Sequence, residues 1–263
     1  MAFETIQFTV EDGVATLTLN RPQALNSFTS EMHAEVREAM RQVREDGVVR
    51  CLVITGAGRG FCAGQDLGDR AVATDGGAPD LGESVEKNYN PLIRGIMGLP
   101  KPVICAVNGV AAGAGASLAL ACDIVLAARS ASFVQVFCKI GLVPDSGGTW
   151  NLPRAVGLAR AKGLAMLGEK LPAEKAEEWG LIWKCVEDDD LAEEAGKMAR
   201  HFATQPTRAL GRIKQLLNES GTRTLHEQTD LEKAAMQELG QSDDYREGVA
   251  AFMEKRPPVF KGA

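Results

Sequence analysis

The stretch Val103-Ile-Cys-Ala-Val-Asn-Gly-Val110, continued by Ala112-Gly-Ala-Gly-Ala-Ser-Leu-Ala-Leu-Ala-Cys122, decides the fold of this chain. The first part is apolar and partly β-branched, which predicts a buried strand that ends in an Asn-Gly turn. The second part consists of small residues and predicts a helix. The first N–H groups of a helix lack intrahelical partners and lie at its positive end, so the N–H of Ala114 is available to an anionic oxygen. The alternative is that the small residues only permit close packing of the helix on the strand.

A second glycine-rich turn lies upstream, in Gly60-Phe-Cys-Ala-Gly-Gln-Asp-Leu67. It follows a predicted strand at residues 48–55, so the N–H of Gln65 is a candidate for a second backbone donor. Two such donors directed at one oxygen form an oxyanion hole, which stabilises the negative charge that develops on a carbonyl during enolate formation.

One carboxylate, Asp145, lies in Gly141-Leu-Val-Pro-Asp-Ser-Gly-Gly-Thr149, behind a proline and ahead of two glycines. An apolar run begins upstream, and we expect its side chains to raise the pKa of the Asp145 carboxyl by excluding water, which makes it a stronger base. These side chains are Phe133, Val136, Phe137 and Leu142. The alternative is that Asp145 only caps the helix that follows.

Composition narrows the class of protein. The chain has 263 residues, of which 45% are hydrophobic, enough for one domain with an appendage. A net charge of −6 argues against general attraction to nucleic acid or to an anionic membrane. The beginning of the chain lacks a signal-peptide pattern, and no segment has the roughly 18 apolar residues of a spanning helix, so we expect a cytoplasmic protein. The six cysteines contain no Cys-x-x-Cys pair, which favours reduced thiols over disulfides or a metal site.

Hydrophobic periodicity predicts an α/β body over residues 1–190 and a helical region over 191–263. Residues 3–20 alternate as a hairpin around Asp12-Gly13, and apolar runs at 48–55, 103–107 and 124–127 predict buried strands between helices. A stripe of apolar residues follows Ser30, a candidate N-cap. Residues 68–90 are rich in Gly, Asp and Pro and predict a loop. The last four predicted helices cover 191–202, 206–218, 225–239 and 243–255.

Several motifs resemble those of the crotonase (enoyl-CoA hydratase/isomerase) family along nearly the whole chain. They are Arg21-Pro-Gln-Ala-Leu-Asn26, Gly60-Phe-Cys-Ala-Gly-Gln-Asp-Leu67, Pro102-Val-Ile-Cys-Ala-Val-Asn-Gly109, Gly141-Leu-Val-Pro144, Gly147-Gly-Thr149 and Leu152-Pro-Arg154. The resemblance implies a spiral of β-β-α units with a C-terminal helical trimerisation region. It also implies an acyl-CoA substrate whose thioester oxygen meets the N–H groups of Gln65 and Ala114.

The chain departs from typical hydratases of that family at the two catalytic glutamates, whose positions hold Ser117 and Phe137. Asp145 occupies a place that is glycine in those hydratases, as in family isomerases that use a single aspartate. The chain most resembles isomerases that convert a ring epoxide of phenylacetyl-CoA into an oxepin during aerobic phenylacetate degradation. The matching stretches include Ser84-Val-Glu-Lys-Asn-Tyr-Asn-Pro91, Glu178-Trp-Gly-Leu-Ile-Trp183 and Asp244-Tyr-Arg-Glu-Gly248.

Three other functions stay open at this point. They are a Δ3,Δ2-enoyl-CoA isomerase of aliphatic acyl-CoAs, a dehalogenase-like hydrolase, and a non-catalytic protein that only binds CoA esters.

The resemblance also assigns the binding residues. It places the CoA moiety along the backbone near Ala24, Ala63, Asp66 and Leu67, with Phe137 at the acyl group. Phe252 and Lys255 of the last helix would reach the CoA of a neighbouring subunit in a homotrimer or hexamer, although a lysine at a helix end can also be merely solvated. Tyr89 and the predicted loop at 68–90 are candidates to close over the acyl group. No cofactor beyond the CoA of the substrate, and no metal, is implied.

Overall fold

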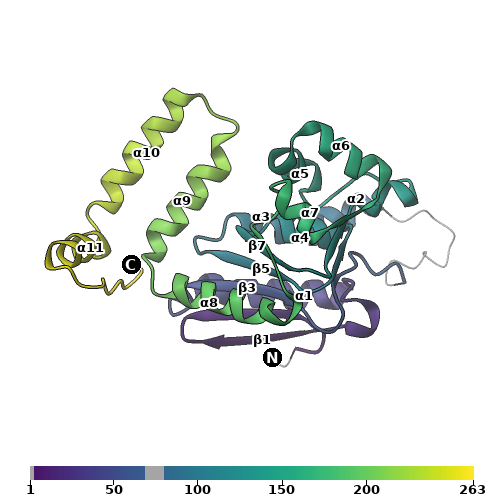
Figure 1. The fold of residues 1–263 in the computed structure, drawn as a ribbon, viewed down its shortest axis with the longest axis horizontal. Helices are drawn as coiled ribbons and strands as arrows, with labels where there is room; N and C mark the ends of the chain where they lie inside the picture. The colour runs from purple at the N-terminus through teal and green to yellow at the C-terminus, as the bar shows by residue number, and fades with distance from the viewer. Residues whose placement is uncertain (1–2, 69–79) are drawn as a thin grey trace.

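The computed structural model describes residues 3–68 and 80–263, and it is built around two β-sheets (Figure 1). The larger sheet has the order β1-β2-β3-β5-β7-β10 and is parallel except for the β1-β2 hairpin. Its strands are β1 Ile6–Glu11, β2 Val14–Leu19, β3 Cys51–Gly56, β5 Val103–Val107, β7 Ile124–Ala128 and β10 Lys184–Val186. The predicted hairpin is confirmed, with Asp12 and Gly13 both at positive φ in its turn.

The smaller sheet runs alongside, in the order β4-β6-β8-β9. Its strands are β4 Gly60–Cys62, β6 Val110–Ala112, β8 Ser132–Val134 and β9 Lys170–Pro172. Each of β3, β5 and β7 is followed within a few residues by β4, β6 or β8, so the chain passes from one sheet to the other and then into helical turns. This arrangement confirms the expected α/β spiral of β-β-α units. It also places the turns after β4 and β6 next to each other, because β4 pairs with β6.

Helix α1, Ser30–Glu45, buries the predicted apolar stripe, including Met32, Val36 and Val43. Its N-cap is Thr29 and not Ser30, since the Thr29 hydroxyl accepts the N–H of Met32. The other helices of the body are η1 Pro22–Ala24, α2 Leu81–Ser84, η2 Val85–Tyr89, α3 Asn90–Met97, α4 Ala114–Leu120, η3 Val136–Ile140, α5 Gly148–Val156, α6 Leu158–Leu167, α7 Ala173–Glu178 and η4 Asp188–Asp190.

The loop prediction for residues 68–90 is wrong where the structure describes that stretch. Residues 81–97 are helical, and the Asp80 carboxylate caps them by accepting the N–H of Glu83. Tyr89, Ile93 and Ile96 recur at helical spacing and are all buried, which explains why this stretch packs as a helix. Residues 69–79, which carry two of the four glycines and two of the three aspartates of the predicted loop, lie outside the described residues.

The predicted helical region at 191–263 has two parts. Helix α8, Leu191–Ala203, packs on β3, β5 and β7 and so belongs to the body. Helices α9 Thr207–Ser220, α10 Leu225–Leu239 and α11 Asp243–Glu254 project from the body as a C-terminal arm (Figure 1). The arm is joined to the body by Lys214, whose Nζ lies 2.8 Å from the Asp123 carboxylate. Arg50 of the body also binds the carbonyl oxygens of Gln205 and Phe260.

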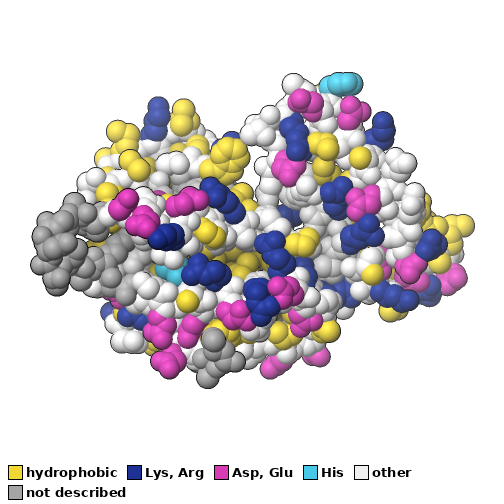
Figure 2. Space-filling view, turned by 180° about the vertical axis from the view of Figure 1, so that it is seen from behind, with side chains coloured by type: hydrophobic (Ala, Val, Ile, Leu, Met, Phe, Trp, Pro, Cys, Tyr) yellow, Lys and Arg dark blue, Asp and Glu magenta, His cyan; other side chains and the backbone are white. Residues whose placement is uncertain are grey.

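The surface carries mixed charge. On the face drawn in Figure 2, Lys and Arg side chains lie among Asp and Glu side chains rather than in one extended field. Within residues 3–68 and 80–263, no helix combines the length and apolar character needed to cross a bilayer. The same residues hold no group of three His, Cys, Asp or Glu side chains arranged for a metal ion.

Candidate active site

The turn at η1 is fastened to the segment that follows β3. The buried Asn26 amide donates to the carbonyl oxygens of Ala57, Gly60 and Phe61, at 2.9, 2.8 and 3.1 Å. Asn26 has φ of +57°, a backbone conformation that asparagine tolerates better than most residues. The N–H of Ala63 donates to Leu25 O at 2.9 Å, so the backbones near Ala24 and Ala63 are brought together.

The backbone of Gln65 is paired with the segment that contains Phe28, and the N–H of Gln65 points away from that segment. Phe28 forms a parallel bridge with Gln65, in which Phe28 N–H donates to Gly64 O and Asp66 N–H donates to Phe28 O. In such a bridge the residue between the two bonded neighbours directs its own N–H to the opposite side. Gln65 N–H therefore faces away from Phe28, and we find no acceptor for it among the described residues.

Ala114 begins α4, and its N–H also has no acceptor within the part of the chain that the structure describes. A Cβ atom on Gly64 would lie 3.2 Å from Ala114 N and 3.0 Å from Ala112 O. A Cβ on Gly115 would lie only 2.2 Å from Cys62 O. The two glycine turns are thus in direct contact, and the predicted pair of donors lies on adjacent stretches of backbone.

The Phe137 ring lies beside Gly113, the residue before α4. A Cβ on Gly113 would be 3.8 Å from Phe137 Cζ and 3.4 Å from Val136 Cγ2. Phe137 is buried, so it forms an apolar wall beside the start of α4. Phe133 is buried too, whereas Val136 and Leu142 are half-buried. That these four side chains exclude water from the Asp145 carboxyl stays a prediction.

Ser117 connects α4 to the segment that carries Asp145. Its Oγ lies 2.7 Å from the position that a Cβ on Gly148 would occupy, and Gly148 N–H donates to Asp145 O at 2.8 Å. Ser117 is one helical turn after Ala114, so the Asp145 turn lies against the helix that begins with Ala114. The Ser117 hydroxyl is fully buried and has no hydrogen-bond partner within residues 3–68 and 80–263.

Asp145 lies in a tight, strained turn. Ser146 has φ of +52° and Gly147 has φ of +75°, and Ser146 Oγ donates to Asp145 Oδ1 at 2.8 Å. Left-handed backbone at a residue other than glycine costs of order 1 kcal/mol and is frequent at functional sites. The N-cap of α5 is Gly147, so Asp145 is not the capping residue that the alternative interpretation required. Its side chain is half-buried.

Asp66 and Leu67 continue the Gln65 segment toward the surface. The Asp66 carboxylate pairs with Arg21 Nη1 at 2.9 Å, and the side chains are 22% and 20% exposed. Arg21 Nη1 also donates to Ser27 O at 2.6 Å, which fastens the η1 turn again. Leu67 is 63% exposed. Ala24, Ala63, Asp66 and Leu67 therefore line one continuous strip of backbone beside the paired donors.

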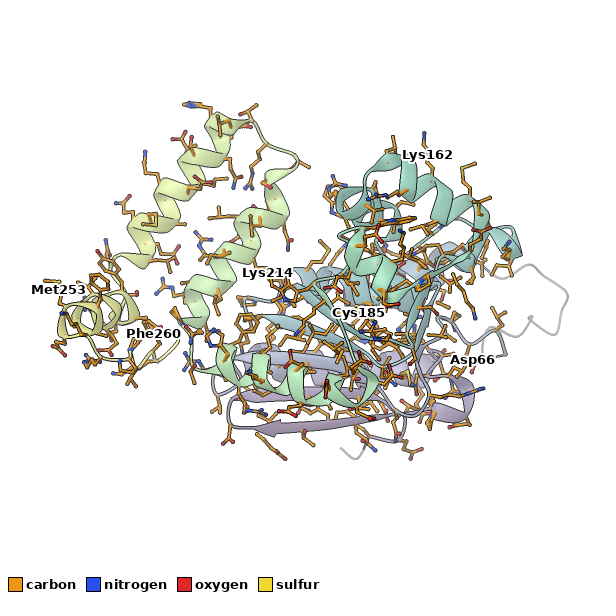
Figure 3. All side chains as sticks on the ribbon, in the orientation of Figure 1. Asp66, Lys162, Cys185, Lys214, Met253 and Phe260 are labelled. Carbon is orange, nitrogen blue, oxygen red and sulfur yellow. The ribbon has the colours of Figure 1, made fainter. Side chains whose placement is uncertain are left out.

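The two arm residues predicted to bind CoA do not join this strip in the same chain. Asp66 lies at one end of the molecule, and Met253, next to Phe252, lies at the other (Figure 3). Phe252 is 82% exposed and Lys255 ends α11 with φ of +55°. The geometry brings together the six residues Gln65, Ala114, Ala63, Ala24, Phe137 and Asp66, and Phe252 and Lys255 lie apart from them within the same chain.

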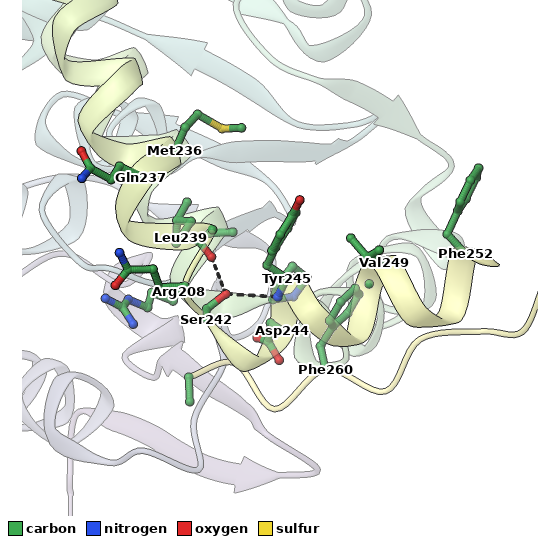
Figure 4. A pocket seen from close by; sticks show the side chains of 16 residues that line it. Arg208, Met236, Gln237, Leu239, Ser242, Asp244, Tyr245, Val249, Phe252 and Phe260 are labelled. Atoms are coloured by element: carbon green, nitrogen blue, oxygen red, sulfur yellow. Dashed lines mark hydrogen bonds between the residues drawn. The ribbon is translucent and has the colours of Figure 1, made fainter. Parts of the chain in front are cut away.

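A cavity of about 750 Å³ lies in the arm, between α10 and α11 (Figure 4). Its lining includes Met236, Tyr245, Val249, Phe252 and Phe260. At its edge, Ser242 Oγ donates to Leu239 O and accepts the N–H of Tyr245. This lining is mainly apolar and is remote from Asp145 in the fold, so we assign the chemistry to the body and not to the arm cavity.

Sequence reasoning missed three residues that shape the site. Asn26 and Arg21 belong to a motif that was recognised, but only the structure shows what their side chains hold. Tyr89 is a candidate to close over the acyl group on the sequence alone, yet it is buried, and its hydroxyl donates to Gln65 Oε1 at 2.9 Å. Its signal in the sequence was its helical spacing from Ile93 and Ile96.

Comparison with known proteins gives a consistent result. Residues 9–263 match the family model described as enoyl-CoA hydratase/isomerase. A relative from Escherichia coli K12 named 1,2-epoxyphenylacetyl-CoA isomerase is 63% identical over 96% of this chain and 97% of its own length. A probable enoyl-CoA hydratase from Rhodobacter capsulatus is 46% identical over the full length of both chains. The crystal structure of a putative enoyl-CoA hydratase/isomerase from Mycobacterium abscessus superposes with a TM-score of 0.94, at 35% identity, over 98% of this chain and all of that one.

Proposed function

The chain belongs to the enoyl-CoA hydratase/isomerase family, and from that premise we propose that it converts ring-1,2-epoxyphenylacetyl-CoA to oxepin-CoA in aerobic phenylacetate catabolism. The observation that carries the proposal is the Asp145 carboxylate, on a turn packed against the helix that begins with Ala114, the proposed source of one of the two donors. The 63% identity to the Escherichia coli isomerase supports the choice of substrate.

The residues at the two positions of the hydratase glutamates favour isomerisation over hydration. Ser117 and Phe137 occupy the places where the resemblance puts the catalytic glutamates of hydratases. Neither a buried hydroxyl nor a phenyl ring is a general base for water. Relocation of a proton, by contrast, needs only one group that removes it and then returns it.

The thioester oxygen would accept the N–H groups of Gln65 and Ala114. As the α-proton leaves, negative charge moves onto this oxygen, and preorganised donors stabilise that charge more than they stabilise the neutral carbonyl. Loss of one such donor typically lowers the rate by about 10²–10³. The glycine at 64 lets the two turns approach closely enough for both donors to reach one atom.

Asp145 would remove the α-proton and later deliver it. The epoxide opens to the oxepin by valence tautomerisation, which breaks the ring carbon–carbon bond. The proton from the α-carbon is then returned to a ring carbon, so the reaction is a net relocation of one proton. No redox group or metal takes part, and CoA is present only as part of the substrate.

The CoA moiety would follow the strip from Ala24 to Leu67. Phe252 and Lys255, which lie at the far end of the same chain, would complete this site from a neighbouring subunit of a homotrimer or a hexamer built from two trimers. The Lys255 ammonium would meet a CoA phosphate. Contacts of this kind, from the backbone strip and from Lys255, would let a protein of net negative charge bind an anionic substrate.

A panel of four CoA esters tests the proposal on the wild-type protein. Enzymatically generated 1,2-epoxyphenylacetyl-CoA, a 3-enoyl-CoA, crotonyl-CoA and 4-chlorobenzoyl-CoA are each incubated with it, and products are identified by liquid chromatography and mass spectrometry. The proposal predicts oxepin-CoA as the fastest product. Turnover of the 3-enoyl ester alone would instead support an aliphatic isomerase, and binding without turnover of any ester would support a non-catalytic role.

A further inference from the structure

The side chain of Gln65 is held by three hydrogen bonds, although only its backbone N–H has a place in the chemistry. Its Nε2 donates to Phe28 O at 3.0 Å and to Asp66 O at 3.2 Å, and its Oε1 accepts the Tyr89 hydroxyl at 2.9 Å. We propose that Tyr89 is a positioning residue that fixes the Gln65 peptide, and with it the oxyanion donor, by clamping the Gln65 side chain. The inference deepens the proposed function and rests on its oxyanion hole.

Tyr89 is itself rigidly placed. It is 2% exposed, and its ring meets that of His33 edge to face with centroids 4.5 Å apart. The Phe28 ring is 6.0 Å from the Tyr89 ring and 4.6 Å from the His33 ring, so the three form one packed cluster. A hydroxyl on such a ring has little freedom to move. Tyr89 is therefore a fixed point from which a hydrogen bond can hold a neighbouring loop.

Phe28 completes the clamp from the backbone. It pairs with Gly64 and Asp66 on either side of Gln65, and its own carbonyl also accepts the Gln65 Nε2. The Gln65 peptide is thus constrained by its two neighbours in the chain and by its side chain. Among these constraints, the hydrogen bond from Tyr89 joins two side chains, and Tyr89 lies on the helical segment η2, apart from the Phe28 and Gln65 segments.

The clamp matters because the residues just after Gln65 are weakly held. Leu67 and Gly68 are exposed, so packing at these two positions does little to fix the Gln65 peptide. An oxyanion donor must be held in place before the charge develops, since reorganisation during the reaction would add to the barrier. We expect loss of the Tyr89 hydroxyl to lower kcat about tenfold, less than the loss of a donor, with KM changed by less than about twofold.

Tyr89→Phe removes only the hydroxyl, and Gln65→Met removes the side-chain hydrogen bonds while it keeps the backbone N–H. Tyr89→Phe should lower kcat about tenfold, and Gln65→Met, which also loses the two Nε2 hydrogen bonds, should lower it at least as much. The double variant should be no slower than Gln65→Met alone, because the bond to Tyr89 is already absent from Gln65→Met. Tyr245→Phe is the matched control, since Tyr245 is the second of the two tyrosines and lies exposed on the arm. It should keep the wild-type kcat. Thermal unfolding of each variant shows whether its fold is retained.

A spectroscopic measurement separates positioning from a merely structural role. Phenylacetyl-CoA labelled with carbon-13 at the thioester carbonyl has no epoxide or double bond to rearrange, so its carbonyl stretch can be recorded in the bound state by difference infrared spectroscopy. Wild type should shift the stretch to lower frequency, and Tyr89→Phe should reduce that shift. An unchanged shift in both Tyr89→Phe and Gln65→Met, with wild-type kcat in either, would overturn the inference.

The outcomes distinguish the inference from the proposed function. If wild type shifts the carbonyl of labelled hexanoyl-CoA but not that of phenylacetyl-CoA, the proposed substrate is wrong, and the role of Tyr89 is decided with hexanoyl-CoA. If neither ester shows a shift, Gln65 and Ala114 do not form an oxyanion hole, and both proposals fail. Should Tyr89→Phe not fold, Gln65→Met with wild-type kcat and shift would still refute the clamp.

Discussion

A methyl group on Gly64 would lie 3.2 Å from the backbone nitrogen of Ala114. The two residues are fifty positions apart and belong to the two glycine turns that the sequence singled out. Their contact brings the N–H groups of Gln65 and Ala114 onto neighbouring stretches of backbone. Because the contact is this close, a single added Cβ at position 64 would change the distance between those two N–H groups.

Gly64→Ala is therefore expected to lower kcat strongly. Gly64 has φ of +89°, so alanine would be strained there, and its Cβ would push against Ala112 O and Ala114 N. We expect kcat to fall about 10²-fold or more, the typical result of a misplaced oxyanion donor. The control is Gly163→Ala in α6, where a Cβ meets nothing within 4 Å. Steady-state kinetics of the two variants makes the comparison, and equal activity would contradict the oxyanion-hole assignment.

The Arg21–Asp66 pair is expected to hold the CoA-binding strip. Arg21→Met keeps the length of the side chain but leaves the half-buried Asp66 carboxylate without its cation, so KM for the acyl-CoA should rise several-fold, while the free energy of unfolding falls by about 1–3 kcal/mol. Arg41→Met is the control. Arg41 pairs with Glu38 and Glu45 on the surface of α1 and is 52% exposed. Urea unfolding and KM should separate the two variants, and identical results would mean that the Arg21 pair is only a surface contact.

Lys255→Ala tests the role of the arm. If Lys255 meets a CoA phosphate of another copy, its removal should raise KM for the acyl-CoA about five- to tenfold with little change in kcat, and added salt should raise the wild-type KM more than that of the variant. Lys162→Ala on α6 is a control at the other side of the molecule (Figure 3). A KM unaffected by Lys255→Ala would show that this lysine is only a solvated helix end.

The buried thiol of Cys62 predicts a loss of stability in alkali. Burial raises the pKa of Cys62 from 9.0 to about 12. Below pH 9 the thiol is neutral in both states, so its burial has no pH-dependent cost. As pH rises through 9 toward 12, the unfolded chain loses the proton first, and stability falls by about 1.4 kcal/mol per pH unit for this one group. Cys62→Ala should have a shallower decline in urea unfolding between about pH 9.5 and pH 10.5. If the free energy of unfolding falls equally with pH in the variant and in wild type, the raised pKa of Cys62 is contradicted.

The sequence was sufficient for the spiral because local patterns and packing agree there. The strand at Val103–Val107 begins and ends where the apolar run predicted, and α10 has the predicted bounds. The strand ends at an Asn-Gly turn, and the helix begins at a capping box formed by Thr224 and Glu227.

Predictions failed where two signals competed. Ser30 and Thr29 are both good caps, and only the backbone shows that Thr29 is the residue outside the helix. Around residue 80, the Gly-rich composition predicted a loop, whereas residues 81–97 are helical and their buried residues begin at Tyr89. Side-chain partners were equally out of reach, since the bond between Tyr89 and Gln65 joins residues 24 positions apart. Composition does not predict a side-chain hydrogen bond between such distant residues. Nor does it predict that α8 packs on the body while the three helices after it form the arm.

Asp145→Asn tests the central claim most directly. The amide keeps the size of the side chain but cannot accept a proton, so the account predicts that oxepin-CoA formation falls by about 10³-fold or more while the affinity for phenylacetyl-CoA stays within about threefold of wild type. Single-turnover kinetics gives the first quantity and isothermal titration calorimetry the second. A variant that binds and turns over at a rate within about tenfold of wild type would show that Asp145 is not the base.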